Sequence, residues 1–431
     1  MNLIQNVNWD ALPGADDITR VELENGIVIL TRSNFNSPSV VINGYLPCGS
    51  RFDPRNHLGL ANFTASCLMR GTSKYSFEQI YETLESEGAN LGFGASVHNS
   101  VFGGRALSED LPMVFELLSE SLRYPAFPEE HFHKQKDRAI AGLAIRDQST
   151  PDVASMKFDQ LLFPDHPYGF PEDGYIETLG AIERDDLLKF HRDQYSPKGM
   201  VLSVVGGVSA QQVIDWVNEF LGDWKSNSDR VVAHMPIPPN GSKEVKKHIF
   251  VPGKTQADLV IGTRGPCRYD EDYLSISLGN NILGQFGMMG RIGEIVREKA
   301  GLAYYASSSL SAWVSSGSWE VSAGVNPANL EKAEKLIIAE LRKFSTEMVS
   351  EAELEESKAG YIGRLPLSLE SNSGVANALL NMERFDLGMD YFREYPGKVS
   401  EITAEGILEA SARFLDPDKL VIVSAGPEVI D

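Results

Sequence analysis

Two stretches of this chain repeat at one fixed distance along the sequence. The segment YSPKGMVLSVVGGV lies near the middle of the chain and LDPDKLVIVSAGP lies near its end. Pro197 and Pro417 are 220 residues apart, and so are Gly206 and Gly426. A second pair, VVINGYLPCGSRFDP and ADLVIGTRGPCRYDED, opens each half at nearly the same offset. Two independent segments that share one offset predict a duplicated domain, so the chain has to build the same architecture twice.

The boundary between the two copies is predicted at residues 226–244. The sequence there is SNSDRVVAHMPIPPNGSKE, in which Pro, Gly, Ser and Asn are dense and the apolar periodicity lapses. We therefore expect an N-terminal domain over 1–225, a linker over 226–244 and a C-terminal domain over 245–431. Two domains also suit a length of 431 residues.

Each half mixes strand and helix patterns in the same order. Runs rich in β-branched residues at 26–33 and 39–46 predict strands. Helical patterns follow at about 59–68 and 77–87, then a strand pair within 90–107. Apolar residues three and four apart then predict a helix in each half, carried by Leu111, Val114, Phe115, Leu118 and Leu122, and by Leu330, Ala333, Leu336, Ile337, Leu341 and Phe344. The fold class we expect is α+β, with two similar sandwiches of mixed sheet and helices.

Charge limits the classes of partner. The formal net charge is −21. Contacts to phosphates need clustered Lys and Arg, so we expect no nucleic-acid partner. An acidic surface attracts basic peptides, and it also simply keeps a protein in solution; both interpretations remain open.

Nothing in the sequence predicts a membrane or a secretory route. The opening residues MNLIQNVNWDALPGADD have neither a basic segment nor an apolar run, and no stretch of about 18 apolar residues follows. The chain has three cysteines, and a count that is both small and odd argues against a disulfide framework. We expect a cytoplasmic protein without a membrane partner; a mature organelle protein whose targeting segment has been removed is the alternative.

Residues 49–72 read GSRFDPRNHLGLANFTASCLMRGT. This stretch resembles the metal-binding segment of the pitrilysin/insulinase (inverzincin) family of zinc peptidases, G-S-R-x-[DE]-x-x-x-x-x-G-[LI]-A-H-F-L-E-H-x-L-F-x-G-T. The frame of the pattern is present at Gly49, Ser50, Arg51, Gly59, Leu60, Ala61, Phe63, Leu68, Gly71 and Thr72. The resemblance extends over nearly the whole chain and implies a peptidase-like fold that forms half of a clamshell dimer.

The metal-binding residues of that family are missing. Its inverted motif H-x-x-E-H supplies two zinc ligands and the general base, and here Asn62, Ala65 and Ser66 stand at those three positions. The family's third ligand, a Glu about 77 residues past the second His, aligns with Leu143. Amide and hydroxyl groups are poor zinc ligands, and Ala and Leu have no group that could bind metal or move a proton. We therefore expect no metal and no cofactor in this chain.

A second signature of the family survives in the C-terminal half. The sequence LGQFGMMGRIGEIVREKAGLAYYASSSL resembles the family pattern that carries a catalytic Arg and Tyr seven residues apart. The matching residues are Arg297 and Tyr304. The resemblance implies that Tyr304 donates a hydrogen bond to the oxyanion of peptide hydrolysis and that Arg297 binds a substrate carbonyl or carboxylate. The alternative is that Arg297 only pairs with Glu298 or Glu294.

The glycine-containing stretch GQFGMMG occupies the place of a substrate-binding Gly-rich loop found in a zinc-lacking subunit of the same family. The candidate substrate-binding residues are Gly284, Gly287, Gly290 and Arg291.

Taken with the resemblance, these residues predict a division of labour between two subunits. This chain would supply Arg297 and Tyr304 in trans to a homologous, zinc-bearing subunit, and unstructured peptides would be the substrate. Alone it would be inactive. The rival interpretations are a structural or assembly subunit, a peptide-binding homodimer and an active peptidase with an unusual metal site.

Overall fold

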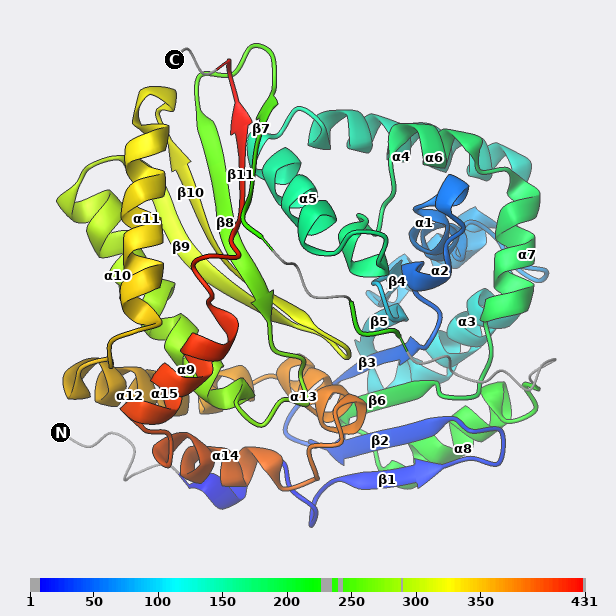
Figure 1. Cartoon of the computed structure of the whole chain (residues 1–431). Coiled ribbons are helices and arrows are strands. Elements are labelled where there is room, and N and C mark those ends of the chain that lie inside the picture. Colours follow the sequence, from blue (N-terminus) through cyan, green and yellow to red (C-terminus); the bar gives the residue numbers. More distant parts are fainter. Residues whose placement is uncertain (1–7, 226–234, 239–242, 288–289, 429–431) are drawn as a thin grey trace.

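The computed structural model describes residues 8–225, 235–238, 243–287 and 290–428. Two β-sheets, each covered by helices, lie side by side (Figure 1). In this view the strands of the second sheet run vertically and those of the first sheet run roughly horizontally. The predicted linker, 226–244, and the first seven residues fall largely outside the described residues, so the predicted domain boundaries stay predictions.

The first half contains β1 (Thr19–Glu22), β2 (Val28–Ser33), β3 (Ser39–Leu46), α1 (Leu60–Cys67), α2 (Phe77–Ser86), β4 (Asn90–Ala95), β5 (Ser100–Leu107), α3 (Leu111–Arg123), α4 (Glu129–Arg146), α5 (Thr150–Leu162), α6 (Ile176–Ala181), α7 (Arg184–Gln194), β6 (Val201–Gly206) and α8 (Ala210–Leu221). The second half contains β7 (Val245–Phe250), β8 (Ala257–Gly265), α9 (Tyr273–Gly284), α10 (Gly290–Ile292), β9 (Ala303–Ala312), β10 (Gly317–Val325), α11 (Leu330–Phe344), α12 (Glu351–Ser368), α13 (Asn372–Arg384), α14 (Tyr391–Ser400), α15 (Ala404–Phe414) and β11 (Val421–Gly426). The strands and helices predicted above are all present, with ends shifted by two residues at most in the cases where both ends were given.

The two sheets share one topology apart from β1, an additional edge strand of the first sheet, which confirms the α+β class and the duplication. Their strand orders are β1-β2-β6-β3-β5-β4 and β7-β11-β8-β10-β9. Strand β6 lies between β2, to which it is parallel, and β3, to which it is antiparallel. Strand β11 lies in the same way between β7 and β8. Because β6 and β11 begin at Val201 and Val421, the structural repeat falls on the 220-residue offset.

Each sheet buries one face against helices of its own half. In the first half, side chains such as Ile42 and Phe115 form a core beneath α1, α3 and α8. In the second half, Trp319 and Phe344 lie in the corresponding core beneath α9, α11 and α15. Burying each large apolar side chain contributes about 1.5–3 kcal/mol relative to leaving it exposed, so both cores suffice without disulfides.

The opposite face of each sheet is covered by a helix from the other half. Helix α5 packs Phe158 onto Val260 and Val423 of the second sheet. Helix α13 packs Leu379 onto the first sheet, in a cluster with Leu30 and Val205. In Figure 1, α5 lies against the vertical strands and α13 lies by the horizontal ones. The two halves are therefore interlocked, and neither sheet is covered on both faces by its own half alone.

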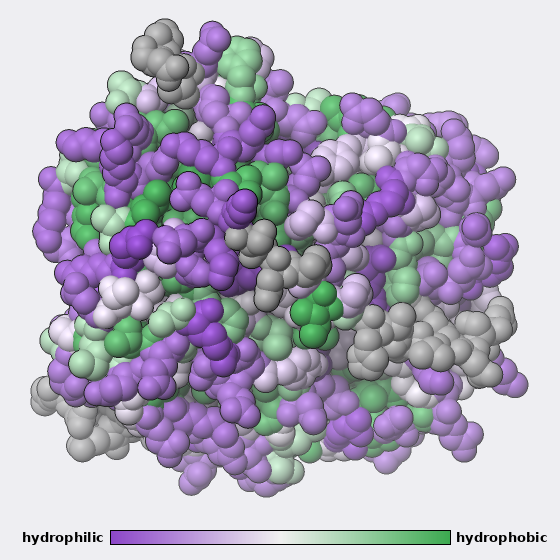
Figure 2. All heavy atoms as spheres, viewed as in Figure 1, coloured by the Kyte–Doolittle hydropathy of each residue, from purple (hydrophilic) through white to green (hydrophobic). Residues whose placement is uncertain are grey.

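The surface is mostly hydrophilic on the face seen in Figure 2, with hydrophobic residues in scattered patches. Within the described ranges, no helix has the length and apolar character that a membrane span requires.

Candidate functional site

The start of α1 explains why the frame of the metal-binding segment persists without its ligands. Gly59 precedes the helix with φ = +96°, and a Cβ there would lie 2.6 Å from the carbonyl oxygen of Asp173. The partly buried carboxylate of Asp53 accepts hydrogen bonds from the backbone N–H groups of Gly59 and Ala61, both at 2.9 Å. Burial raises the pKa of Asp53 to about 7. These residues shape and cap the helix, a task that needs no metal.

Three of the four degenerate positions converge on one pocket. Asn62, Ser66 and Leu143 line a hollow of about 190 Å³ between α1 and α4. The fourth, Ala65, is buried beside it with 1% of its surface exposed. Ser66 and Leu143 are far apart in the sequence but lie close together in the fold.

The side chains in this pocket do not suit zinc. The Ser66 hydroxyl donates to the Phe63 carbonyl at 2.8 Å, and Leu143 is 3% exposed. Asp173, which the sequence analysis did not single out, also lines the pocket, but its carboxylate is paired with Arg146 at 2.7 Å. The described part of the chain contains no group of three His, Cys, Asp or Glu side chains able to hold a metal ion.

Arg297 lies on a π-helix that spans Gly293–Lys299. The amide of Ala300 donates to the carbonyl of Ile295, five residues back, at 3.2 Å. Gly301 follows with φ = +63° and turns the chain into β9. Single-turn π-helices carry a cost and occur often at functional sites. The Arg297 side chain is 35% exposed and lies 3.7 Å from the Glu298 carboxylate, which is the loose ion pair of the alternative interpretation.

Tyr304 lies at a β-bulge on the free edge of the second sheet. Among the described strands, β9 pairs only with β10, and its register places Tyr305 opposite Gly324 and Ala303 opposite Val325. Tyr304 is the extra residue between them, and it is 68% exposed. Bulges aim a side chain away from the regular alternation and are common beside active sites. The phenol is therefore directed to solvent from a fixed backbone.

A buried polar network holds the backbone at this bulge. The carboxylate of Asp258, 1% exposed, accepts a 2.7 Å hydrogen bond from the Tyr305 hydroxyl and another from Gln256. Thr150, at the start of α5, donates its hydroxyl to the same carboxylate. A Cβ on Gly324 would lie 2.5 Å from the Tyr305 ring, so glycine leaves room for that ring. The network joins the first half of the chain to the strand that carries Tyr304.

The glycines of the stretch GQFGMMG have roles in packing and backbone conformation that the sequence did not predict. A Cβ on Gly284 would lie 2.2 Å from the backbone nitrogen of Ser308, so this glycine lets α9 approach β9. Gly287 and Gly290 have φ values of +58° and +63°. The two methionines between them, at 288 and 289, lie outside the described residues. The glycines thus shape the turn, and their role toward substrate stays a prediction.

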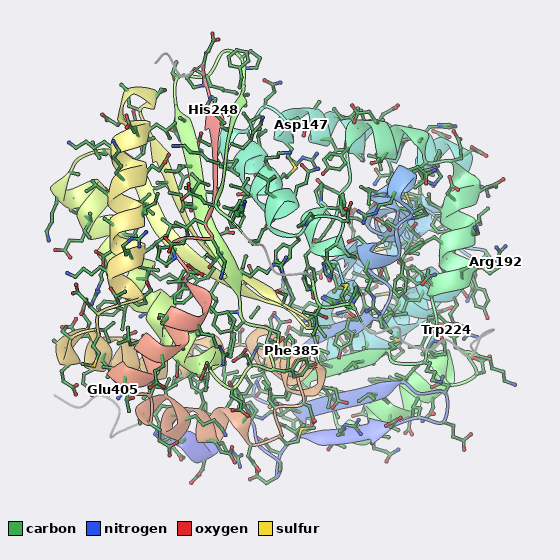
Figure 3. All side chains as sticks on the ribbon, viewed as in Figure 1. Asp147, Arg192, Trp224, His248, Phe385 and Glu405 are labelled. Atoms are coloured by element: carbon green, nitrogen blue, oxygen red, sulfur yellow. The ribbon has the colours of Figure 1, made fainter. Side chains whose placement is uncertain are left out.

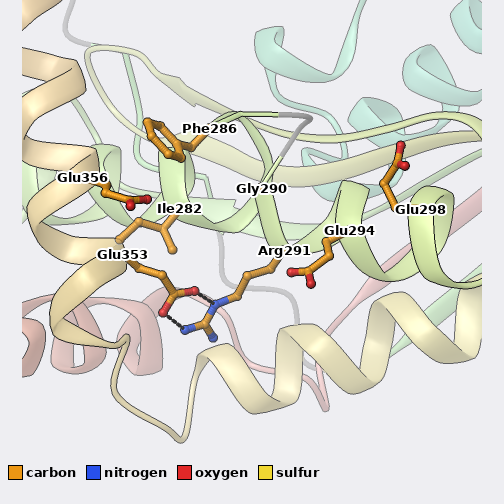
Figure 4. Close-up of a pocket in the computed structure, with 8 residues that line it drawn as sticks. All are labelled: Ile282, Phe286, Gly290, Arg291, Glu294, Glu298, Glu353 and Glu356. Atoms are coloured by element: carbon orange, nitrogen blue, oxygen red, sulfur yellow. Dashed lines mark hydrogen bonds and ion pairs between the residues drawn. The ribbon is translucent and has the colours of Figure 1, made fainter.

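Arg291 is engaged by carboxylates of its own chain. Its guanidinium binds Glu353 through two hydrogen bonds of 2.7 and 2.8 Å (Figure 4). It also lies 3.5 Å from the carboxylate of the buried Glu340. The hydrogen bond from Arg291 lowers the pKa of Glu353 to about 2. The surrounding hollow of about 300 Å³ is also lined by Glu294, Glu298 and Glu356. The guanidinium of Arg291 is thus already paired within its own chain, and its contact with substrate stays a prediction.

Two descriptions of one protein family match successive parts of the chain. The model described as "Insulinase (Peptidase family M16)" matches residues 28–169, and the model described as "Peptidase M16 inactive domain" matches residues 181–361.

Relatives and solved structures extend over most of the chain. The uncharacterized zinc protease YmxG of Bacillus subtilis is 26% identical over 83% of this chain and 85% of its own length. An uncharacterized zinc protease of Rickettsia bellii is 27% identical over 88% of this chain and 90% of its own length. The crystal structure of a peptidase M16 inactive domain from Pseudomonas fluorescens has a TM-score of 0.89 and 26% identity, and covers 96% of this chain and 99% of its own. A protease from Helicobacter pylori shares the fold at a TM-score of 0.89, with 19% identity over 96% of this chain and 100% of its own. The two curated relatives are named as zinc proteases, whereas the metal-binding positions here hold residues that do not suit zinc.

Proposed function

Because the chain belongs to the insulinase family, peptidase family M16, and its metal-binding positions do not suit zinc, we propose that it is the zinc-lacking subunit of a heterodimeric metallopeptidase. A homologous subunit supplies the zinc and the general base, and this chain supplies Arg297 and Tyr304. The two subunits close as a clamshell around an unstructured peptide. The cytoplasmic location expected from the sequence belongs to the same proposal.

One contrast carries the proposal. At the metal-binding positions, Leu143 is apolar and buried, and the hydroxyl of Ser66 donates to a backbone carbonyl of its own helix. Arg297 and Tyr304 instead remain accessible, on a π-helix and at a β-bulge. Irregular backbone has a free-energy cost that a purely structural element avoids. Its presence at both residues supports a retained role toward a ligand.

The chemistry assigned to this chain is binding and charge stabilisation. The phenol of Tyr304 donates a hydrogen bond to the oxygen of the scissile carbonyl as negative charge develops there. The guanidinium of Arg297 binds a neighbouring backbone carbonyl or a carboxylate of the peptide. Both groups act through hydrogen bonding and charge, without gaining or losing a proton.

The proposal is tested with a quenched fluorogenic peptide. Turnover is measured for this chain alone with added zinc, for a homologue from the same organism that carries the zinc motif, and for their mixture. The proposal predicts turnover in the mixture that neither subunit shows alone and that a chelator abolishes. No gain on mixing would favour the assembly-subunit or peptide-binding alternatives, and turnover by this chain alone would contradict the assignment of the metal.

A further inference from the structure

A separate hollow, whose lining includes neither Arg297 nor Tyr304, lies apart from the degenerate metal pocket. It is a hollow of about 590 Å³ where the end of β9 meets α9, α12, α13 and α14. Figure 3 shows Phe385, one of its lining residues, near the meeting point of the two halves. Its volume falls in the range of pockets that hold small molecules or peptide residues, about 300–1,000 Å³.

The lining combines aromatic rings with cations and contains no carboxylate. Six rings face the hollow, from Tyr273, Tyr361, Phe385, Tyr391, Phe392 and Tyr395. The charged residues among the lining are Arg268 and Arg364. The net charge of the whole chain is −21, so a pocket lined by two arginines and no carboxylate differs clearly in charge from the rest of the protein.

Arg268 packs against aromatic rings and pairs with no carboxylate of the described residues. Its guanidinium carbon lies 3.9 Å from the Tyr273 ring centroid and 5.3 Å from that of Phe385. The carboxylates of Asp270 and Asp272, which are close to it in sequence, are paired with Arg413 instead. Among the described residues no ion pair engages Arg268 or Arg364. A guanidinium stacked on aromatic faces keeps its planar N–H edge for bidentate binding of a carboxylate.

We propose that this hollow binds the C-terminal residue of a peptide that ends in an aromatic or large apolar side chain. The terminal carboxylate pairs with Arg268, with Arg364 at the rim, and the side chain packs among the aromatic rings. The inference draws on the proposed function only in naming a peptide as the ligand. It concerns this chain alone and needs no partner subunit.

The test compares three probes on the full-length chain by isothermal titration: N-acetyl-phenylalanine, its C-terminal amide, and the dipeptide amide N-acetyl-Phe-Asp-NH₂. The free acid is expected to bind at least about tenfold more tightly than either amide, because only it combines a terminal carboxylate with an apolar side chain at the right spacing. Equal binding of the three probes, or absence of binding by the acid, would overturn the proposal. A dipeptide amide that binds as tightly as the acid would assign the site to side-chain carboxylates and also overturn it.

Two variants locate the site. Arg268→Gln and Arg364→Gln are each expected to weaken binding of the acid, the first by about tenfold or more. The matched control is Arg192→Gln, which removes an exposed arginine of α7 that does not line the hollow and should leave the affinity unchanged. Because Arg364 is exposed on α12, its variant keeps the fold even if Arg268→Gln does not. Unchanged affinity in a folded Arg268→Gln protein would contradict the assignment, whatever the peptidase assay of the pair shows.

Discussion

The hydroxyl of Tyr305 donates a 2.7 Å hydrogen bond to the buried carboxylate of Asp258. Tyr305 directly follows the exposed Tyr304 on β9. This bond anchors the backbone next to the β-bulge from which Tyr304 projects into solvent. Burial and this hydrogen bond raise the pKa of Tyr305, so its hydroxyl stays protonated as the donor.

Tyr305→Phe is therefore predicted to lower both stability and turnover of the assembled pair. Loss of the hydrogen bond leaves Asp258 with one donor fewer and should cost about 1–3 kcal/mol in the free energy of unfolding. The control is Tyr195→Phe, which removes a buried 2.9 Å hydrogen bond to Ser100 in the other sheet's domain. Urea unfolding and peptide turnover are measured for both. If the two variants lose stability and turnover to the same extent, the network has no special link to Tyr304.

The wild-type chain is predicted to bind no zinc, and the triple variant Asn62→His, Ser66→His, Leu143→Glu is predicted to bind about one ion per chain. The three positions line one pocket, so the introduced imidazoles and carboxylate can meet at a tetrahedral ion. Zinc content is measured by atomic absorption after dialysis, with His131→Ala and His133→Ala as controls for surface binding. Stoichiometric zinc in the wild-type chain would contradict the absence of a metal site, and a zinc-free, folded triple variant would contradict the proposed convergence.

Because each half covers a sheet of the other, we expect the chain to unfold in a single cooperative transition. A destabilising substitution in α5 should shift that whole transition. Phe158 is fully buried between α5 and the second sheet, so Phe158→Ala should lower the free energy of unfolding by about 3–5 kcal/mol. Phe35→Ala is the control, because Phe35 is 72% exposed. Both are followed by denaturant titration with two spectroscopic probes. Two separate transitions, only one of them shifted, would show that the halves fold independently.

Asp159 on α5 is predicted to make stability fall as pH rises. Burial, with a smaller effect from Glu320, raises its pKa to about 8 in the folded chain, against about 3.9 in an unfolded chain. Between these values the folded state holds a proton that the unfolded state releases, so stability falls with rising pH, by at most about 1.4 kcal/mol per pH unit from this group. Asp159→Asn should remove that part of the slope. Urea unfolding at pH 5 and pH 8 checks it, and an identical difference between variant and wild type at both values would contradict it.

Much of the fold followed from sequence because it depends on repeated local patterns. Pro197 and Pro417 marked strands that the structure places at equivalent positions, and Leu143 was assigned by spacing to the pocket it does line. The exchange of α5 and α13 could not be predicted, since an apolar helix face does not reveal which sheet it covers. The π-helix at Arg297, the bulge at Tyr304 and the Asp258 network also escaped prediction. The π-helix and the bulge depend on hydrogen-bond register, which residue types alone do not specify. The network joins Asp258 to Tyr305 and Thr150, which are 47 and 108 residues away from it in sequence.

The partner of Arg291, which follows the glycine-containing stretch, could not be predicted from the sequence either. Arg291 matched a family pattern by position, yet its guanidinium is paired with Glu353, 62 residues further on. A pattern match specifies the residue type and its place in the chain, and the ion pair that occupies the side chain appears only in three dimensions.

Turnover by the assembled pair with Tyr304→Phe tests the central claim most directly. The variant removes one hydroxyl from a side chain that is 68% exposed, so folding and assembly should be unaffected, which size-exclusion chromatography checks. Tyr124→Phe, at an exposed tyrosine of the first half, is the control. The account predicts a fall in kcat of about 10²–10³-fold for Tyr304→Phe, with KM little changed, because the hydrogen bond acts on developing charge. Turnover equal to that of the wild-type pair would contradict a catalytic role for this chain.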